Sequence, residues 1–428
     1  MTLEDALINK FDNPFKNDGV LFEVKNRAFE KFKASGFPTT KNEEWKYTNI
    51  SPYLKHDYCL NQPQKSTEIN VSEYFLSQND SEKIVLENGN LISFPVISGV
   101  EILSFEDAQK KHPQLIEKTL TKINYDEEFI NINTALAEKG FFIYVKKGVQ
   151  IKKPIEILSV QNKNVASFYQ LNNIIILESG SEIKLVEQIK TTSDNVSFIN
   201  NVTRLSIAEN SFLELVKIQN NNSESVLVDS VNTVQQNNST CEVNTLLFGG
   251  KFIRNNLSFL QEGENCQSNM SGVVLINENQ FADNHTFVDH KSPNCQSSEL
   301  YKGVYLDNAK GVFNGKILVR KNAQKIDAFQ ANNNLVISDS ASIDSKPQLE
   351  IFADDVKCSH GCTIGQVDED ALFYMQTRGF SKKEAKALLT YAFTIDALEK
   401  ISIPFVQDFG KKIFAEKLKT SIQFDDLC

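Results

Sequence analysis

The alternation of apolar and polar positions divides the chain into three regions. Up to residue 135 the pattern is mixed, and its clearest element is an amphipathic helix over 20–35, which Gly36 ends. A polar stretch over 61–67 predicts a linker. The first region is therefore expected to be a partly helical domain, residues 1–135. The apolar positions of its helix recur at helical spacing: Leu21, Val24, Ala28 and Phe32.

Short β runs dominate the second region, residues 136–365. Runs such as 174–177 and 213–218 are separated by polar turns that contain Gly or Asn, and the early turns recur about every 30 residues. This loose period, with almost no helix between the strands, predicts stacked coils of a solenoid, with a two-sheet sandwich as the alternative. The asparagine runs at 220–222 and 332–334 are then expected to form ladders between coils.

The third region, residues 366–428, is predicted to be helical. A first helix runs over 368–377, Ser381 and Glu384 form a capping box for a second, and a last helix covers 405–421. Amphipathic helices after a solenoid can cap its last coil, dock a partner in a groove, or do both.

One strand carries most of the candidate chemistry. Read with a two-residue period, its positions 356, 358, 360, 362 and 364 share a face, which holds Cys358, His360 and Cys362 among apolar neighbours. Alternate side chains lie about 6.6 Å apart, too far for three neighbours to chelate one ion comfortably. Three interpretations remain: a packed strand, a zinc site closed by a distant ligand such as Cys295 or His290, or an open soft-metal site that a partner chain completes.

Composition excludes several classes of function. A net charge of −10 and a pI near 5.2 argue against nucleic acid as the main partner. Seven scattered cysteines do not form a disulfide framework. The acidic first seven residues are not a secretory signal, and no apolar run approaches the ~20 residues of a membrane span, so a cytoplasmic protein is expected.

Enzymatic motifs are weak. The sequence contains no phosphate-binding Gly-rich loop and no Gly-x-Ser-x-Gly nucleophile motif. Asp289 and His290 could form a base with its orienting carboxylate, but no activated nucleophile stands beside them, so a structural corner is favoured.

Several segments match a known family. They are 44–48 around the only tryptophan, 312–317, 323–330, 347–366 and 377–379. These motifs, strongest between residues 283 and 400, resemble the SufB/SufD family of the SUF iron–sulfur cluster assembly machinery. Gly361 stands where SufB members usually carry glutamate, and the tryptophan motif is SufD-like, so the SufD members are the better match. Cys362 departs from the small apolar residue expected there.

The resemblance implies a mainly β fold: a right-handed parallel β-helix core with α-helical N-terminal and C-terminal domains. It implies a non-enzymatic scaffold subunit that pairs with SufB and binds the ATPase SufC, in a complex of one SufB, one SufD and two copies of SufC. His360, with Cys358, is the implied ligand of a transient iron–sulfur cluster that SufB helps to hold. No cofactor is expected to stay bound to the chain alone. A flavin in the complex, and a homodimer in isolation, are left open.

The resemblance also assigns ATPase binding to the C-terminal helices. The alternatives from other classes are a SufB-like paralogue, a carbohydrate-active β-helix protein and a structural β-helix polymer. The residues expected to bind the ATPase subunit are Leu372, Phe373, Tyr374, Arg378, Gly379, Leu388 and Phe393.

Overall fold

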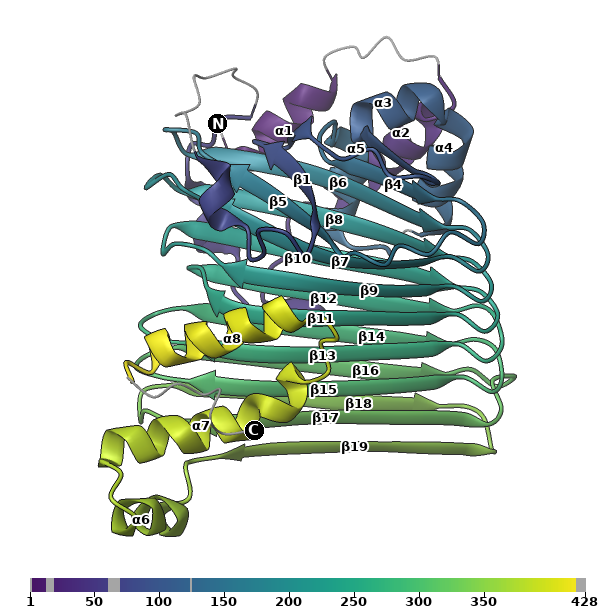
Figure 1. Cartoon of the computed structure of the whole chain (residues 1–428). Coiled ribbons are helices and arrows are strands. Elements are labelled where there is room, and N and C mark those ends of the chain that lie inside the picture. The colour runs from purple at the N-terminus through teal and green to yellow at the C-terminus, as the bar shows by residue number, and fades with distance from the viewer. Residues whose placement is uncertain (1, 13–18, 61–69, 124, 421–428) are drawn as a thin grey trace.

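The chain folds around a parallel β-solenoid with helices at both ends of the sequence (Figure 1). The structure is a computed structural model that describes residues 2–12, 19–60, 70–123 and 125–420. The linker predicted over 61–67 lies outside the described residues. The mainly β fold and the solenoid predicted from the sequence are confirmed, and the sandwich alternative is wrong.

Each coil contributes one strand to each of two facing sheets, and successive coils add parallel neighbours. One sheet contains β4 (Phe141–Val145), β6 (Ser167–Leu177), β8 (Ser197–Ile207), β10 (Ser225–Gln235), β12 (Phe252–Gln261), β14 (Phe281–His290), β16 (Lys310–Val319) and β18 (Ser342–Ile351). The other contains β5 (Ile155–Gln161), β7 (Glu182–Thr191), β9 (Phe212–Asn220), β11 (Thr240–Gly249), β13 (Gln267–Ile276), β15 (Gln296–Tyr305), β17 (Ile326–Val336) and β19 (Val356–Gly365).

The N-terminal region closes the first coil. Its strand β1 pairs with β5, β2 pairs with β1, and β3 pairs with β4. The predicted helix over 20–35 is present as α2. The elements are α1 (Leu3–Asp12), α2 (Phe22–Ser35), β1 (Glu82–Glu87), β2 (Asn90–Ser93), β3 (Val100–Ser104), α3 (Phe105–Lys111), α4 (Pro113–Lys122) and α5 (Glu128–Leu136), with short 3₁₀ turns at Glu43–Trp45, Ser51–Lys55 and Val71–Tyr74.

The corners of the coils explain the turn pattern in the sequence. Residues with left-handed backbone recur at two corners, one before the odd-numbered strands and one before the even-numbered strands. Asparagine suits such positions because its short polar side chain tolerates positive φ. Because the two corner series interleave along the chain, the later turns are more closely spaced in sequence. The first series is Asn210, Asn238, Asn265, Asn294 and Lys325, and the second includes Glu278 and Asp307.

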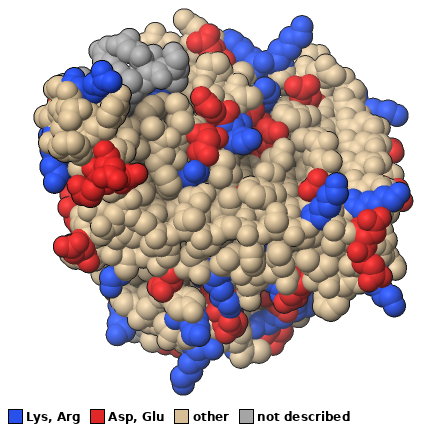
Figure 2. All heavy atoms as spheres, turned by 90° about the horizontal axis from the view of Figure 1, so that it is seen from below, with Lys and Arg blue, Asp and Glu red and all other residues tan. Residues whose placement is uncertain are grey.

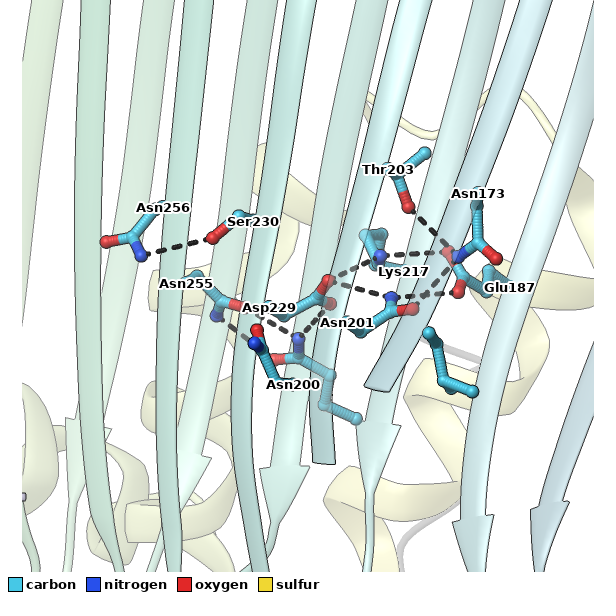
Figure 3. A network of polar contacts seen from close by, with 12 residues as sticks. Asn173, Glu187, Asn200, Asn201, Thr203, Lys217, Asp229, Ser230, Asn255 and Asn256 are labelled. Carbon is cyan, nitrogen blue, oxygen red and sulfur yellow. Dashed lines mark hydrogen bonds and ion pairs between the residues drawn. The ribbon is translucent and has the colours of Figure 1, made fainter. Parts of the chain in front are cut away.

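A charged network lies inside the solenoid, between the two sheets (Figure 3). Lys217 Nζ lies 2.8 Å from Glu187 Oε2 and 2.8 Å from Asp229 Oδ1, and all three side chains are at most 3% exposed. Burial raises the pKa of Glu187, and the attraction of Lys217 only partly offsets this. Burial by itself would lower the pKa of Lys217, but the two carboxylates overcome this and raise it. Asparagine side chains link the network to neighbouring coils: Asn173, Asn201, Asn255 and Asn284. The two predicted asparagine runs also bond between coils: Asn222 Nδ2 donates to the Ser193 carbonyl oxygen and Asn333 Nδ2 to Thr363 Oγ1, both at 2.8 Å.

The C-terminal helices pack on the side of the odd-numbered sheet. Outward apolar residues of β9, β11, β13 and β15 form one cluster with residues of α7 and α8, including Tyr391 and Phe414. The capping box of Ser381 and Glu384 is confirmed. The helices do not cap the last coil, so that interpretation is wrong, because the apolar outer face of the sheet attracts them instead. They are α6 (Glu369–Thr377), α7 (Lys382–Leu398) and α8 (Pro404–Lys417). In the described part of the chain, no helix is long and apolar enough to cross a membrane.

The tryptophan motif fastens the N-terminal region to the outer face of the even-numbered sheet. The Arg254 guanidinium lies 3.8 Å from the Trp45 ring centre and 2.8 Å from Asp283 Oδ2. His285 lies between two carboxylates, 3.0 Å from Asp283 and 3.4 Å from Glu44. These contacts join residues distant in sequence and hold the Glu44–Trp45 segment against β12 and β14.

Acidification is expected to loosen this fastening. The hydrogen bond with His285 lowers the pKa of Glu44. Burial opposes ionisation of Asp283, but His285 and Arg254 lower its pKa below the ordinary value. Groups with depressed folded pKa values stabilise the fold above their unfolded pKa, and this contribution is lost as pH falls through the folded pKa. We expect the fluorescence of Trp45 to shift to the red below about pH 4, before global unfolding. A Glu44→Gln variant should begin this shift at higher pH, and identical titrations of both proteins would contradict the assignment.

Candidate functional site at the open end of the solenoid

The last coil, formed by β18 and β19, leaves one end of the solenoid uncovered in the described chain (Figure 1). We call this surface the open end. β18 and β19 are edge strands, because each pairs with a neighbour on one side only. Pro347 lies in the middle of β18, and proline is tolerated within a sheet essentially at edges. The sequence thus carries a local signal that β18 ends its sheet.

The predicted face of β19 is the face that points into the solenoid. Cys358, His360 and Cys362 pair in register with Ala328, Gln330 and Asn332 of β17. Those three β17 residues are buried, with side chains between the sheets. No further coil lies over β19 in the described part of the chain, so the same positions on β19 are uncovered: His360 and Cys362 are exposed and Cys358 is half-buried. The packed-strand interpretation is therefore wrong.

The two thiols of this face differ in their surroundings. Cys358 packs against an apolar cluster that includes Ala328. Burial, followed by the negative charge of Asp327, raises the pKa of the Cys358 thiol. Cys362 is exposed, and its Sγ lies 3.0 Å from Ser345 Oγ of β18. Cys358 is thus the recessed thiol and Cys362 the accessible one.

The structure gives no support to a zinc site closed by Cys295 or His290. Cys295 is fully buried, and its thiol donates to the Gly263 carbonyl oxygen at 3.3 Å. His290 is buried with Nε2 3.0 Å from Ser297 Oγ, and burial lowers its pKa to about 3. Within the described ranges, no three His, Cys, Asp or Glu residues come together around a single ion.

Asp289 and His290 do not form an acid–base pair. The Asp289 carboxylate binds Arg320, with contacts of 2.6 and 2.8 Å. The His290 side chain lies on the opposite, inner face of β14, because adjacent strand residues alternate. The structural corner expected from the sequence is the better description.

The predicted partner-binding residues separate into two groups. Phe373 and Tyr374 of α6 are 69% and 55% exposed, and Arg378 lies beside the Tyr374 ring, with a hydrogen bond of 2.8 Å to its hydroxyl. Gly379 ends α6 with a left-handed φ of 97°. By contrast, Leu372 and Leu388 are 2% and 6% exposed, so their side chains serve packing of the helices. Phe393 is half-buried, with Lys302 Nζ 4.7 Å from its ring centre.

Sequence reasoning missed the neighbours of Cys362. Ser345 and Asn332 come from β18 and β17, and Ser345 Oγ donates to Asn332 Oδ1 at 2.8 Å. Alternation along each strand could have placed both residues on inner faces. Their meeting with Cys362 depends on how the two sheets close at the last coil.

The open end as a whole is a broad face with few charges at its centre. Figure 2 views the molecule from this end and shows acidic and basic side chains gathered mainly toward the edge. Large apolar side chains are exposed on the last coils: Phe329, Ile351, Phe352 and Ile364. An exposed edge of two sheets with apolar residues is typical of a surface that another chain covers.

These features define a β-solenoid protein with soft metal ligands on an uncovered terminal coil. Comparison with known proteins agrees with this class. The family model described as "SUF system FeS cluster assembly, SufBD core domain" matches residues 159–393, and "SufBD protein N-terminal region" matches residues 14–157. The chain therefore belongs to the SufBD family, which takes part in iron–sulfur cluster assembly.

Two of the similar proteins are named SufD. The chain is 28% identical over 377 residues to "Iron-sulfur cluster assembly protein SufD" of Escherichia coli (strain K12), covering 86% of each chain. It is 24% identical over 434 residues to the protein of the same name from Bacillus subtilis (strain 168), covering 98% of this chain and 99% of the relative. The resemblance to SufD noted from the sequence is confirmed.

Proposed function

We propose that this chain is a non-enzymatic scaffold subunit of a cytoplasmic SUF complex. Its open end pairs with a SufB-like subunit, and a nascent iron–sulfur cluster is bound between the two chains as cargo. Its C-terminal helices bind the SufC-like ATPase. The observation that carries the proposal is His360: an imidazole at an inward-facing position of β19, exposed because no described coil lies over that strand.

The chemistry of the open end supports this role. Neutral imidazole and thiolate are ligands that suit iron and its clusters. Among the described residues no three His, Cys, Asp or Glu side chains come together around one ion, so the open end needs further ligands to complete a metal site. A partner that covers the edge can supply the missing ligands and exclude water. Because Cys358 is recessed and its thiol resists ionisation, His360 is the better placed of the two proposed ligands.

The ATPase-binding surface is proposed to centre on α6. Phe373 and Tyr374 are adjacent and expose large apolar side chains to solvent. Contiguous exposed apolar area of this kind often marks a surface that binds another protein. Aromatic side chains of this kind often dominate binding energy at interfaces. Leu388, by contrast, contributes through packing of α7.

Capture of partners tests the proposal. We expect a tagged chain, co-expressed with SufB-like and SufC-like subunits, to recover both. The double variant Phe373→Ala with Tyr374→Ala should lose most of the ATPase, retain the SufB-like subunit, and keep its melting temperature.

Leu388→Ala is the matched control for the helical region. The substitution should lower the free energy of unfolding by about 2–5 kcal/mol, as expected for a buried leucine. This variant should capture less ATPase only in proportion to the fraction of its helices that is unfolded. Recovery of the chain without either subunit would overturn the proposed function. If the double variant captures as much ATPase as the wild type, the ATPase does not bind at Phe373 and Tyr374 of α6, and that part of the proposal is wrong.

A further inference from the structure

Two buried cysteines are stacked at one corner of the solenoid. Cys266 directly precedes β13 and Cys295 directly precedes β15. The first residues of these strands, Gln267 and Gln296, pair in register, so the two cysteines occupy the same position in adjacent coils. The Gln296 N–H donates to the Cys266 carbonyl oxygen at 2.8 Å, and both cysteine side chains are fully buried. The fold therefore stacks two thiols that are distant in the sequence.

The two sulfur atoms are neighbours and share a hydrogen-bond acceptor. The Gly263 carbonyl oxygen lies 3.2 Å from Cys266 Sγ and 3.3 Å from Cys295 Sγ. The hydrogen bond with Cys266 lowers the pKa of Cys295, and the same contact raises the pKa of Cys266. The pair is therefore asymmetric, with Cys295 the more readily ionised thiol.

The spacing of the coils suits a disulfide between them. Neighbouring strands lie about 4.7–4.9 Å apart, and the Cα atoms that a disulfide joins are usually about 4.4–6.8 Å apart. Both cysteines are free thiols in this structure. The same corner position holds Ser239 in the coil before and Ile326 in the coil after, so no third thiol competes at this corner. The backbone spacing is thus already that of a disulfide.

The corner allows a small oxidant to reach the pair. Each cysteine stands between two exposed residues of its turn, so one layer of residues separates the sulfur atoms from solvent. Asn265 and Asn294, directly before the cysteines, have the left-handed backbone of the corner. Buried thiols are generally unreactive, so we expect reaction only with an oxidant as small as hydrogen peroxide, when the corner opens locally.

We propose that Cys266 and Cys295 are a peroxide-sensitive pair that forms a reversible disulfide between adjacent coils. The Cys295 sulfur attacks one oxygen of hydrogen peroxide and the O–O bond breaks. A sulfenic acid remains on Cys295, and the other oxygen leaves with the thiol proton as water. The Cys266 sulfur then displaces the hydroxyl group, which leaves with the second thiol proton as water, and the S–S bond forms. Two electrons pass from the thiols to the peroxide, and a dithiol reductant reverses the change.

This inference is independent of the proposed function, and a chain that keeps only the buried thiols tests it. Serine replaces Cys59, Cys358, Cys362 and Cys428, so that Cys241, Cys266 and Cys295 remain. The folded chain is treated with hydrogen peroxide, then denatured and alkylated, and its free thiols are counted. We expect the count to fall from three to one and to return to three after dithiothreitol. Peptide mapping of this chain and of the wild type should recover a cross-linked peptide that contains Cys266 and Cys295.

Cys241→Ala is the matched control, because this thiol is also fully buried but pairs in register with Leu213 and Ser268. It should leave the cross-link intact, whereas Cys266→Ala or Cys295→Ala should abolish it. Oxidation should also raise the melting temperature by a few degrees, since a disulfide restricts the unfolded chain, and the two single variants should lose this rise.

Three results would overturn the proposal. They are an unchanged count of free thiols after treatment of the folded chain, a cross-link that forms only in denaturant, and sulfinic acid on either cysteine without a cross-link. Each would show that the two thiols serve packing alone.

Discussion

The His360→Ala variant is expected to form no cluster in the complex while it folds and assembles normally. The imidazole is exposed on the last strand, so its removal leaves no cavity and should change stability by less than about 0.5 kcal/mol. It also removes the best placed soft-metal ligand at the open end. Iron and sulfide content after reconstitution is the primary measurement, and thermal melting and subunit recovery are the secondary ones.

Ser359→Ala is the matched control for this experiment. Ser359 is also exposed but lies on the opposite face of β19, because adjacent residues alternate. It should retain the full cluster content. A His360→Ala complex with the iron and sulfide of the wild type would refute the proposed role of the open end.

The largest loss of stability is expected from Lys217→Met. The substitution removes the cation that pairs with both Glu187 and Asp229, which are at most 3% exposed. Removing one partner of a buried ion pair typically lowers the free energy of unfolding by about 3–5 kcal/mol, because the other charge stays buried without a counter-ion. In urea denaturation at pH 7, the lower free energy of unfolding should appear as a lower midpoint concentration of urea. Part of the lost stability should return at lower pH, where Glu187 takes up a proton.

A triple variant separates charge from packing. Adding Glu187→Gln and Asp229→Asn to Lys217→Met leaves neutral groups of similar shape, and should recover most of the lost stability, since replacing a whole buried ionic group is often nearly neutral. Lys310→Met, at an exposed strand position, is the control and should change stability by less than about 0.5 kcal/mol. A single Lys217→Met variant as stable as this control would show that the buried charges do not depend on the lysine.

Local patterns predicted much of the architecture. The two-residue period over 356–364 placed Cys358, His360 and Cys362 on one face, and the register with β17 confirms it. The turn pattern gave the solenoid because corners that need left-handed backbone select asparagine and glycine. The capping box at Ser381 marked the start of α7, because its two hydrogen bonds join residues only three positions apart.

Long-range packing decided what those patterns could not. The C-terminal helices were open to interpretation as a cap, but the structure packs them on the apolar outer face of the odd-numbered sheet. Leu372 and Leu388 were predicted to bind a partner, but the structure buries both side chains, and Leu388 belongs to the cluster that the helices form with this sheet. The buried triad around Lys217 brings together three different strands, so no local signal revealed it.

The sequence by itself determined the β-solenoid, the helical ends and the shared face of the two thiols and the imidazole, because strand period and turn chemistry act between near neighbours in the chain. Only the tertiary structure decided that this face is uncovered, that Cys358 is recessed, and that Cys362 meets Ser345. Exposure at β19 depends on the absence of a following coil, and the Cys362 contact depends on the closure of one sheet against the other. Both are properties of the assembled coils, which no single segment encodes.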